Sequence, residues 1–405
     1  MFNYLINTTQ RWDEVLYRKP TMQAIIIAIK QSVPILAIDI YWRLIMKIAI
    51  SPDALLANLF DQYPILPDNV IDISRHISAL LDATVILIFI AGLTHQYLKE
   101  KSIQNTTLPV LTNLIITYLL LFNKNQLVPY NTVPYLLITV ITILTCQTYL
   151  WYYNRNSPAL SHYALRYLFW SFICIIIFGK LLHIVLQLPR LQSFSSTILS
   201  QSFFTTFLGL LLVSFFSPIL FIMGLPLPLE FTNNQTTLNT VVANLDTMLT
   251  HGLTTLPFPE NLYSVYGSFT LLGGIGNTLA LNVLLLFAAS KSIRRLGLLA
   301  WIPSLFDNNC LLFSGMPLFM RPLMLVPMLM TNIISMLISY TAIACHFIHP
   351  SVYITPSNLP NILLPTLASP TPIRSTLVTI LIFCVSLLIY RPFLSRLILE
   401  VSHEK

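Results

Sequence analysis

Long apolar stretches separated by short polar segments dominate the first half of the chain. Crossing the hydrocarbon core of a bilayer as a helix takes about 20 apolar residues, so each stretch of this length predicts a membrane span. The clear stretches cover residues 22–50, 79–98, 107–123, 132–152, 164–188 and 200–224. This pattern predicts an all-α, polytopic integral membrane protein.

The second half of the chain interrupts the pattern. Residues 225–265 are rich in Thr, Asn and Pro and too polar to span, so we expect a long loop or an amphipathic helix there. The apolar stretches 268–290 and 296–319 are both broken by glycine, proline or polar residues, whereas 322–348 and 374–398 read as ordinary spans. Unbroken helices are therefore not expected in the two interrupted stretches.

Basic residues in the connecting segments alternate between two sides. Cytoplasmic loops of membrane proteins carry an excess of Lys and Arg, which predicts the orientation of the chain. One side holds Arg11, Arg18, Lys19, Lys99, Lys101, Arg155 and Arg166, and the other holds Arg75, Lys124 and Arg190. This places the N-terminus in the cytoplasm. We expect residues 1–20 to form an interfacial amphipathic helix that lies in the plane of the membrane before the first span.

Composition and motif content exclude several other classes of protein. Only 9% of the 405 residues are charged and 55% are hydrophobic, with a mean hydropathy of +0.74, which excludes an ordinary water-facing surface. The net charge of +7 follows the loops and needs no nucleic-acid partner. The five cysteines form no C-x-x-C pair, and no metal, nucleotide or nucleophile motif is present. We expect membrane lipid as surroundings, no metal site and no bound cofactor.

The two interrupted stretches are the candidate functional segments. Broken helices are tolerated in a membrane only where protein or a water-filled cavity surrounds them, and neighbouring breaks often mark transport sites. The first break reads Leu-Leu-Gly-Gly-Ile-Gly-Asn-Thr-Leu over residues 271–279, and the second lies within 301–317. Close helix packing and simple proline kinks are the alternative explanation. We favour a binding function because both breaks also carry side-chain amides.

Asp307, in the second break, is the only carboxylate between Glu260 and Glu400. A carboxylate within a membrane segment is costly unless it is paired or hydrated, which makes it a functional candidate. A satisfied helix cap is the alternative, for which Asp followed by two Asn residues is well suited. Asp39 and Arg43 are four residues apart on one predicted helix and are expected to form a structural ion pair.

The sequence of the two breaks resembles the enzyme IIC membrane component of sugar phosphotransferase systems, of the lactose and cellobiose (diacetylchitobiose) family. The family's Gly-Gly-x-Gly-x-Thr-Leu run is matched by residues 273–279. Its second motif, similar to Leu-Phe-Asn-Ile-Asn-Glu-Pro followed by Gly-x-Pro, is matched in order and spacing by residues 305–311 and 315–317. Two residues depart from the motif: Cys310 stands where the family has Glu, and Leu311 where it has Pro. A family His before the long loop is not matched, since Ser217 and Pro218 occupy the nearest register.

This resemblance implies about ten transmembrane helices with two re-entrant hairpins in a homodimer of the bacterial cell membrane. Residues 1–225 would form the N-terminal amphipathic helix and the scaffold and dimerisation half, and residues 226–405 the substrate-binding half. It implies import of a β-linked disaccharide, such as cellobiose or lactose, and phosphorylation by enzyme IIB, which is charged through enzyme IIA. The expected substrate-binding residues are Asp307, Asn308, Asn309, Cys310, Gly273, Gly274, Gly276, Asn277 and Thr278.

The departure at Cys310 leaves other functions open. A thiol is a poor substitute for a carboxylate that binds sugar hydroxyls. The chain could therefore be a degenerate enzyme IIC-like protein that binds a partner or regulates without phosphotransfer. A secondary transporter coupled to protons at Asp307 is a third hypothesis.

Overall fold

The computed structural model describes residues 2–60, 66–103, 105–123, 126–127, 135–155, 163–181, 199, 202–225, 227, 239–253, 256–356 and 358–403. These residues are almost entirely helical, as the sequence predicted. The only strands among them are β1 (Phe122–Asn123) and β2 (Gln126–Leu127), which pair antiparallel with Phe122 opposite Leu127.

The first half of the chain contains the following helices: α1 (Phe2–Tyr17), α2 (Pro20–Ile45), its π-helical continuation η1 (Met46–Ile50), α3 (Leu55–Phe60), α4 (Asp68–Glu100), α5 (Thr107–Leu121), α6 (Tyr135–Arg155), α7 (Tyr163–Cys174), η2 (Ile175–Leu181), η3 (Ser202–Thr205) and α10 (Phe207–Ile222). The sequence fixes several of their ends. Pro20 starts α2, because its fixed φ suits the first helical position, and the Thr206 hydroxyl caps α10 by accepting from the Gly209 amide at 3.3 Å.

The second half contains α12 (Asn239–His251), η5 (Leu262–Gly267), α13 (Thr278–Leu286), α14 (Lys291–Leu305), α15 (Cys310–Gly315), α16 (Pro322–Ala344), α17 (Leu364–Ala368) and α18 (Pro372–His403). The stretches 268–290 and 296–319 are broken, as predicted: a loop precedes α13, and a turn separates α14 from α15. The amphipathic-helix alternative for residues 225–265 is confirmed at α12. Residues 226, 228–238 and 254–255 lie outside the described residues.

Five helices in the described part of the chain are long and apolar enough to cross a membrane: Pro20–Phe60, Asp68–Glu100, Tyr135–Tyr153, Pro322–Ala344 and Pro372–Ile398. Three shorter apolar helices, Thr107–Leu121, Tyr167–Lys180 and Phe207–Ile222, correspond to other predicted stretches. The protein is therefore a multi-helix membrane protein whose described spans fall where the apolar runs predicted them. Residues 182–188 of the predicted span 164–188 lie outside the described residues.

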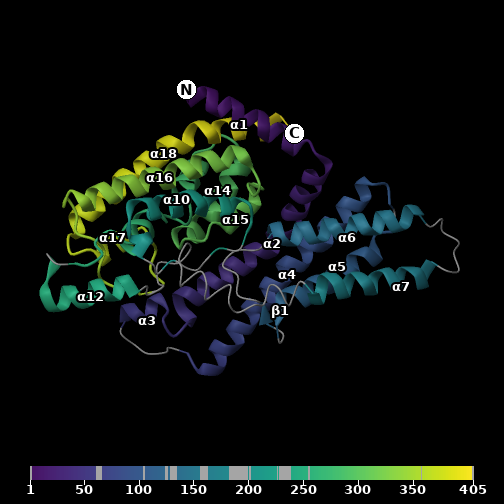
Figure 1. Cartoon of the computed structure of the whole chain (residues 1–405), viewed down its shortest axis with the longest axis horizontal. Coiled ribbons are helices and arrows are strands. Elements are labelled where there is room, and N and C mark those ends of the chain that lie inside the picture. Colours follow the sequence, from purple (N-terminus) through teal and green to yellow (C-terminus); the bar gives the residue numbers. More distant parts are fainter. Residues whose placement is uncertain are drawn as a thin grey trace.

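Helix α2 lies between two groups of helices (Figure 1). Helices α4 to α7 extend to one side of it, and α10 and α14 to α18 lie on the other. Helix α2 packs along α4 and also contacts α14 and α15. Buried rings join the groups: Tyr135 of α6 meets Phe89 of α4 at 4.9 Å between ring centroids and Phe319, after α15, at 4.8 Å. The segment around the second break thus packs against helices of the first half of the chain.

Helix α1, at the start of the chain, packs on α16 in the second half of the chain (Figure 1). The Asp13 carboxylate is buried and accepts from Nε of Arg321 at 2.6 Å, while the Arg321 guanidinium lies 4.4 Å from the ring of Tyr17. The Tyr17 hydroxyl donates to the carbonyl of Pro317 at 2.5 Å. The first helix is therefore fixed to the segment that follows the second break.

Candidate functional site

The first break is a loop of left-handed backbone between η5 and α13. Asn261 starts η5 with a capping box, since its Oδ1 accepts from the amides of Tyr263 and Ser264 at 2.8 Å each. Residues 273, 274 and 276 then have φ of 76°, 101° and 81°, which glycine adopts without strain. Asn277 has φ of 51°, which Asn tolerates better than most residues. The clustered glycines are required by this geometry, which ends one helix and starts the next within the fold.

Side chains from distant helices satisfy the backbone of this loop. The amide of Gly276 donates to Oδ1 of Asn332 at 3.0 Å, and its carbonyl accepts from the hydroxyls of Thr331 at 3.0 Å and Tyr390 at 2.5 Å. Unpaired backbone groups cost several kcal/mol in a membrane interior, so these contacts from α16 and α18 make the break possible. Sequence reasoning did not identify these three residues.

Asn277 is fully buried, and its side-chain amide is engaged in hydrogen bonds within the protein. Its Oδ1 accepts from the Leu272 amide at 3.1 Å, and its Nδ2 donates to the hydroxyls of Ser335 at 2.6 Å and Ser386 at 3.2 Å. Both ends of the side-chain amide are thus committed. This arrangement holds the loop to α16 and α18.

The second break follows the end of α14 at Leu305. Asp307 has φ of 66°, so the chain turns sharply there, and Asn308 accepts from the Cys310 amide at 3.2 Å where α15 begins. The carboxylate of Asp307 accepts from the amide of Gly273 at 3.0 Å and from that of Asn361 at 2.8 Å. Asp307 therefore joins the second break to the first break and to the segment before α17, rather than capping α15.

Asn309 and Thr278 complete the contact between the two breaks. Both are buried; Nδ2 of Asn309 donates to the Thr278 hydroxyl at 3.2 Å, which in turn donates to the carbonyl of Gly273 at 2.6 Å. A Cβ on Gly274 would lie 2.8 Å from Nδ2 of Asn309, so glycine is needed there for the close approach as well as for its φ. The structure thus brings Gly273, Gly274 and Thr278 of the first break together with Asp307 and Asn309 of the second. Gly276 and Asn277 instead contact α16 and α18.

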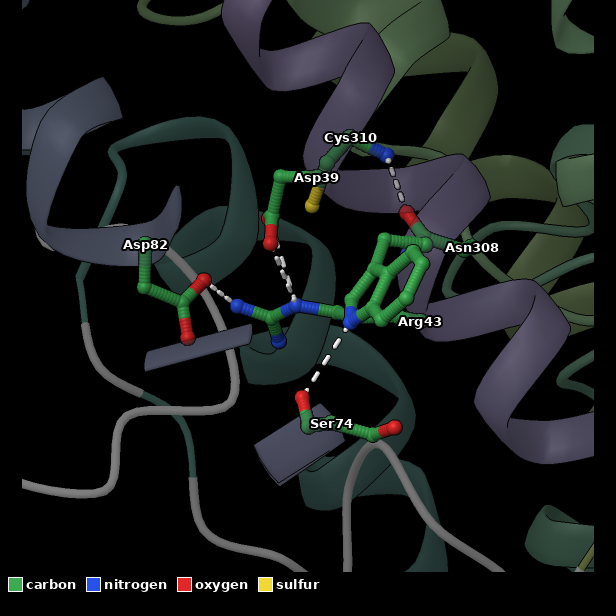
Figure 2. Close-up of polar contacts among 7 residues, drawn as sticks. Asp39, Arg43, Ser74, Asp82, Asn308 and Cys310 are labelled. Carbon is green, nitrogen blue, oxygen red and sulfur yellow. Dashed lines mark hydrogen bonds and ion pairs between the residues drawn. The ribbon is translucent and has the colours of Figure 1, made fainter. Parts of the chain in front are cut away.

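Charged side chains of α2 and α4 lie against the second break (Figure 2). Arg43 bonds Asp39 at 3.2 Å, as the four-residue spacing predicted, and also pairs with Asp82 of α4. The Cys310 thiol lies within electrostatic range of Arg43 and Asp39. Its side chain packs against a buried cluster of Leu36, Ile40, Val85 and Leu311. Asp82 was not singled out from the sequence, although a lone carboxylate within the apolar run 79–98 was a signal for it.

Lys47, one helical turn after Arg43, also reaches the second break. Its ammonium lies 3.4 Å from the carbonyl oxygen of Phe306 and 5.8 Å from the centroid of the Phe306 ring, and it interacts electrostatically with Asp307. Among the described residues, no group of three His, Cys, Asp or Glu side chains is placed to hold a metal ion. The site can therefore offer amides, hydroxyls, backbone groups and a few charges to a ligand.

Comparison with known proteins points to one class of membrane component. A stretch of 129 residues, 32% of the chain, is 29% identical to the cellobiose-specific EIIC component of a PTS system from Lactococcus lactis. The lichenan permease IIC component of Bacillus subtilis is 32% identical over 124 residues, or 30% of the chain. The chain resembles cellobiose-type enzyme IIC components. A cellobiose-specific EIIC component from Geobacillus stearothermophilus is 33% identical over 126 residues, or 31% of the chain.

The aligned stretches span 26%, 27% and 28% of the length of these three enzyme IIC relatives. No family model matches the chain. Among solved structures, the crystal structure of the transporter ChbC, the IIC component of the N,N'-diacetylchitobiose-specific phosphotransferase system, aligns over 99% of both chains at 18% identity, with a TM-score of 0.44.

Proposed function

We propose that this protein is the enzyme IIC sugar permease of a phosphotransferase system and imports a β-linked disaccharide such as cellobiose. The observation that carries the proposal is the sequence similarity to the cellobiose and lichenan permease components. The geometry agrees with it, because two broken helices meet through amides, hydroxyls and backbone groups, which suit the hydroxyls of a sugar. The degenerate alternative is not favoured, because these relatives are named as sugar permeases or components of sugar systems.

The proposed site uses the nine predicted residues in two ways. Asn308, Asn309 and Cys310 contact sugar hydroxyls, and the backbone of residues 273–278 lines the site. Asp307 and Asn277 act by holding the two breaks in place, since both carboxylate oxygens of Asp307 and both ends of the Asn277 amide are engaged. In Asn308 and Asn309, the hydrogen bonds described above engage one end of each side-chain amide. Orienting contacts of this kind keep a binding site rigid.

The proposed architecture follows the enzyme IIC pattern. It has about ten transmembrane helices with two re-entrant hairpins, a cytoplasmic N-terminus, a scaffold half of residues 1–225 and a substrate-binding half of residues 226–405. The protein acts as a homodimer in the bacterial cell membrane. Enzyme IIB phosphorylates the sugar, with phosphate supplied through enzyme IIA, so the permease itself uses no bound cofactor.

The test is uptake of labelled disaccharides by cells that carry the protein with its cognate enzymes IIA and IIB. We expect accumulation of phosphorylated cellobiose or of a related β-linked disaccharide. Omitting enzyme IIB is the control and should abolish accumulation, whereas uptake that persists without it and collapses with the proton gradient would indicate a proton-coupled transporter. Lack of uptake of any β-linked disaccharide by folded protein in the membrane would refute the proposal.

A further inference from the structure

Asp39, Arg43 and Asp82 form an ion cluster inside helices that are apolar enough to cross a membrane. Asp39 and Arg43 lie on α2 and Asp82 on α4, so the cluster joins two helices that are separate in the sequence. It contains two carboxylates and one guanidinium, which leaves one negative charge in excess. Ionisable groups at such positions are costly and are functional candidates by default.

A purely structural role accounts for only part of this cluster. One carboxylate is sufficient to neutralise a guanidinium, and a second adds a desolvation cost that its attraction to the same Arg offsets only in part. The side chain of Asp39 is 4% exposed, whereas those of Arg43 and Asp82 are 41% and 26% exposed. Asp39 therefore binds Arg43 from the interior of the protein. The contact between Arg43 and Asp82 lies on a more accessible face.

The cluster borders the second break through Asp39 and Arg43. Figure 2 shows Cys310 beside Asp39 and the hydrogen bond that joins the Cys310 amide to Asn308. The Cys310 thiol is within electrostatic range of Arg43 and Asp39, and the Cys310 side chain packs with residues of α2. The next turn of α2 places Lys47 against Phe306. One polar face of α2 thus lies opposite the residues that carry the proposed sugar site.

The chemistry of this face suits an uncharged ligand with many hydroxyls. A guanidinium offers several donors and a carboxylate offers only acceptors, whereas each hydroxyl can both donate and accept. Hydrogen bonds to charged partners are about twice as strong as those between neutral groups. Lys47 on the next turn interacts with Asp307, so these two groups together add no net charge. The excess negative charge of the cluster therefore repels an anionic ligand such as a sugar acid, and the cluster favours neutral sugars.

We propose that Arg43 and Asp82 are substrate-contacting residues that form a second wall of the sugar site and select uncharged sugars over sugar acids, and that Asp39 positions Arg43. This inference rests on the proposed function. It assigns to α2 and α4, in the first half of the chain, a direct part in binding.

The test compares binding of cellobiose and of its acid, cellobionate, to the purified full-length protein by calorimetry. Asp82→Asn keeps the size of the side chain and leaves Asp39 and Arg43 as a neutral pair, so the fold should be preserved. We expect at least a tenfold loss of cellobiose affinity, equivalent to about 1.4 kcal/mol, and a smaller preference for cellobiose over cellobionate. The change in preference is a readout that loss of a structural contact alone would not produce.

Asp72→Asn is the matched control, because Asp72 is on the same helix and pairs with Arg75 at 3.5 Å on an exposed surface. It should leave both affinities unchanged. If the unmodified protein binds neither cellobiose nor any other β-linked disaccharide, the proposed function itself fails. If the unmodified protein binds cellobiose and Asp82→Asn retains both the affinity and the preference of Asp72→Asn, the second wall is refuted while the permease proposal stands.

Discussion

Gly274 lies at a close approach between the two breaks. Its φ of 101° and the short approach to Asn309 impose separate requirements on the same residue. We predict that Gly274→Ala destabilises the protein by about 1 to 3 kcal/mol, because the added methyl group is strained by the backbone and collides with the Asn309 amide. Thermal unfolding in detergent measures this loss.

Gly252→Ala separates these two effects. Gly252 has φ of 84°, but a Cβ there would meet nothing within 4 Å among the described residues. This variant should therefore show the backbone strain alone and lower the unfolding temperature less than Gly274→Ala. Equal shifts of the unfolding temperature in the two variants would mean that the collision with Asn309 does not add to the loss of stability in Gly274→Ala.

The sequence predicted where the backbone breaks better than it predicted which side chains the fold engages. Glycine clustering and the polar residues of both breaks were visible in the chain and were correctly expected to adopt broken backbone. The engagement of Asn277 with Ser335 and Ser386 was not visible, because the partners lie 58 and 109 residues away on other helices. Whether an amide is available to a ligand depends on such distant partners, which local pattern does not encode.

At the level of elements, α1 offers a test of long-range attachment. Replacing Arg321 by Leu leaves the buried carboxylate of Asp13 without its ion-pair partner, which typically costs about 3 to 5 kcal/mol. We predict that hydrogen exchange of the amides in α1 then becomes at least a hundredfold faster, as measured by mass spectrometry.

The double variant Asp13→Leu with Arg321→Met should restore most of the protection, since an apolar pair removes the unpaired charge. Arg374→Leu is the control, because Arg374 also contacts an aromatic ring, that of Phe347 at 5.9 Å, but on an exposed surface. Unchanged exchange in the Arg321→Leu variant would show that the ion pair does not hold α1 in place.

Apolar run length predicted most helices, because burial in lipid and the spacing of polar residues are local properties of the chain. The two broken stretches were recognised by the same reasoning, from glycine and proline. The attachment of α1 to α16 was not recognised, since α1 was expected to be a surface helix and its partner Arg321 is 308 residues distant. Pairing between helices depends on which charged groups meet in three dimensions.

For the whole molecule, α2 lies between α4 and the second break. Leu36 and Leu311 pack in one buried cluster there, and the Tyr41 hydroxyl donates to the carbonyl of Leu299 at 2.7 Å. If the substrate-binding half moves during transport, these contacts must separate. We predict that oxidation of a Leu36→Cys, Leu311→Cys variant, with its native cysteines replaced by Ser, blocks sugar uptake and leaves sugar binding as it is in the same variant when reduced. A reductant should restore uptake.

A disulfide within the scaffold is the control for this experiment. Asn113→Cys would face native Cys146, since Nδ2 of Asn113 lies 3.7 Å from Sγ of Cys146, and both residues belong to the first half. Oxidation of that variant should leave uptake unchanged. Full transport by the oxidised Leu36→Cys, Leu311→Cys protein would contradict movement between α2 and the second break.

The loop of the first break forms its hydrogen bonds with α16, α18, Asp307, Asn309 and Asn361. Within the described part of the chain, none of these bonds involves a charged side chain of α2 or α4. Backbone shape and side-chain chemistry are thus encoded in separate parts of the chain. Duplicated genes could diverge in substrate range through a few substitutions in α2 and α4 while the loop stays constant. A library aimed at a new sugar should accordingly randomise positions 39, 43 and 82 and keep residues 271–279 unchanged.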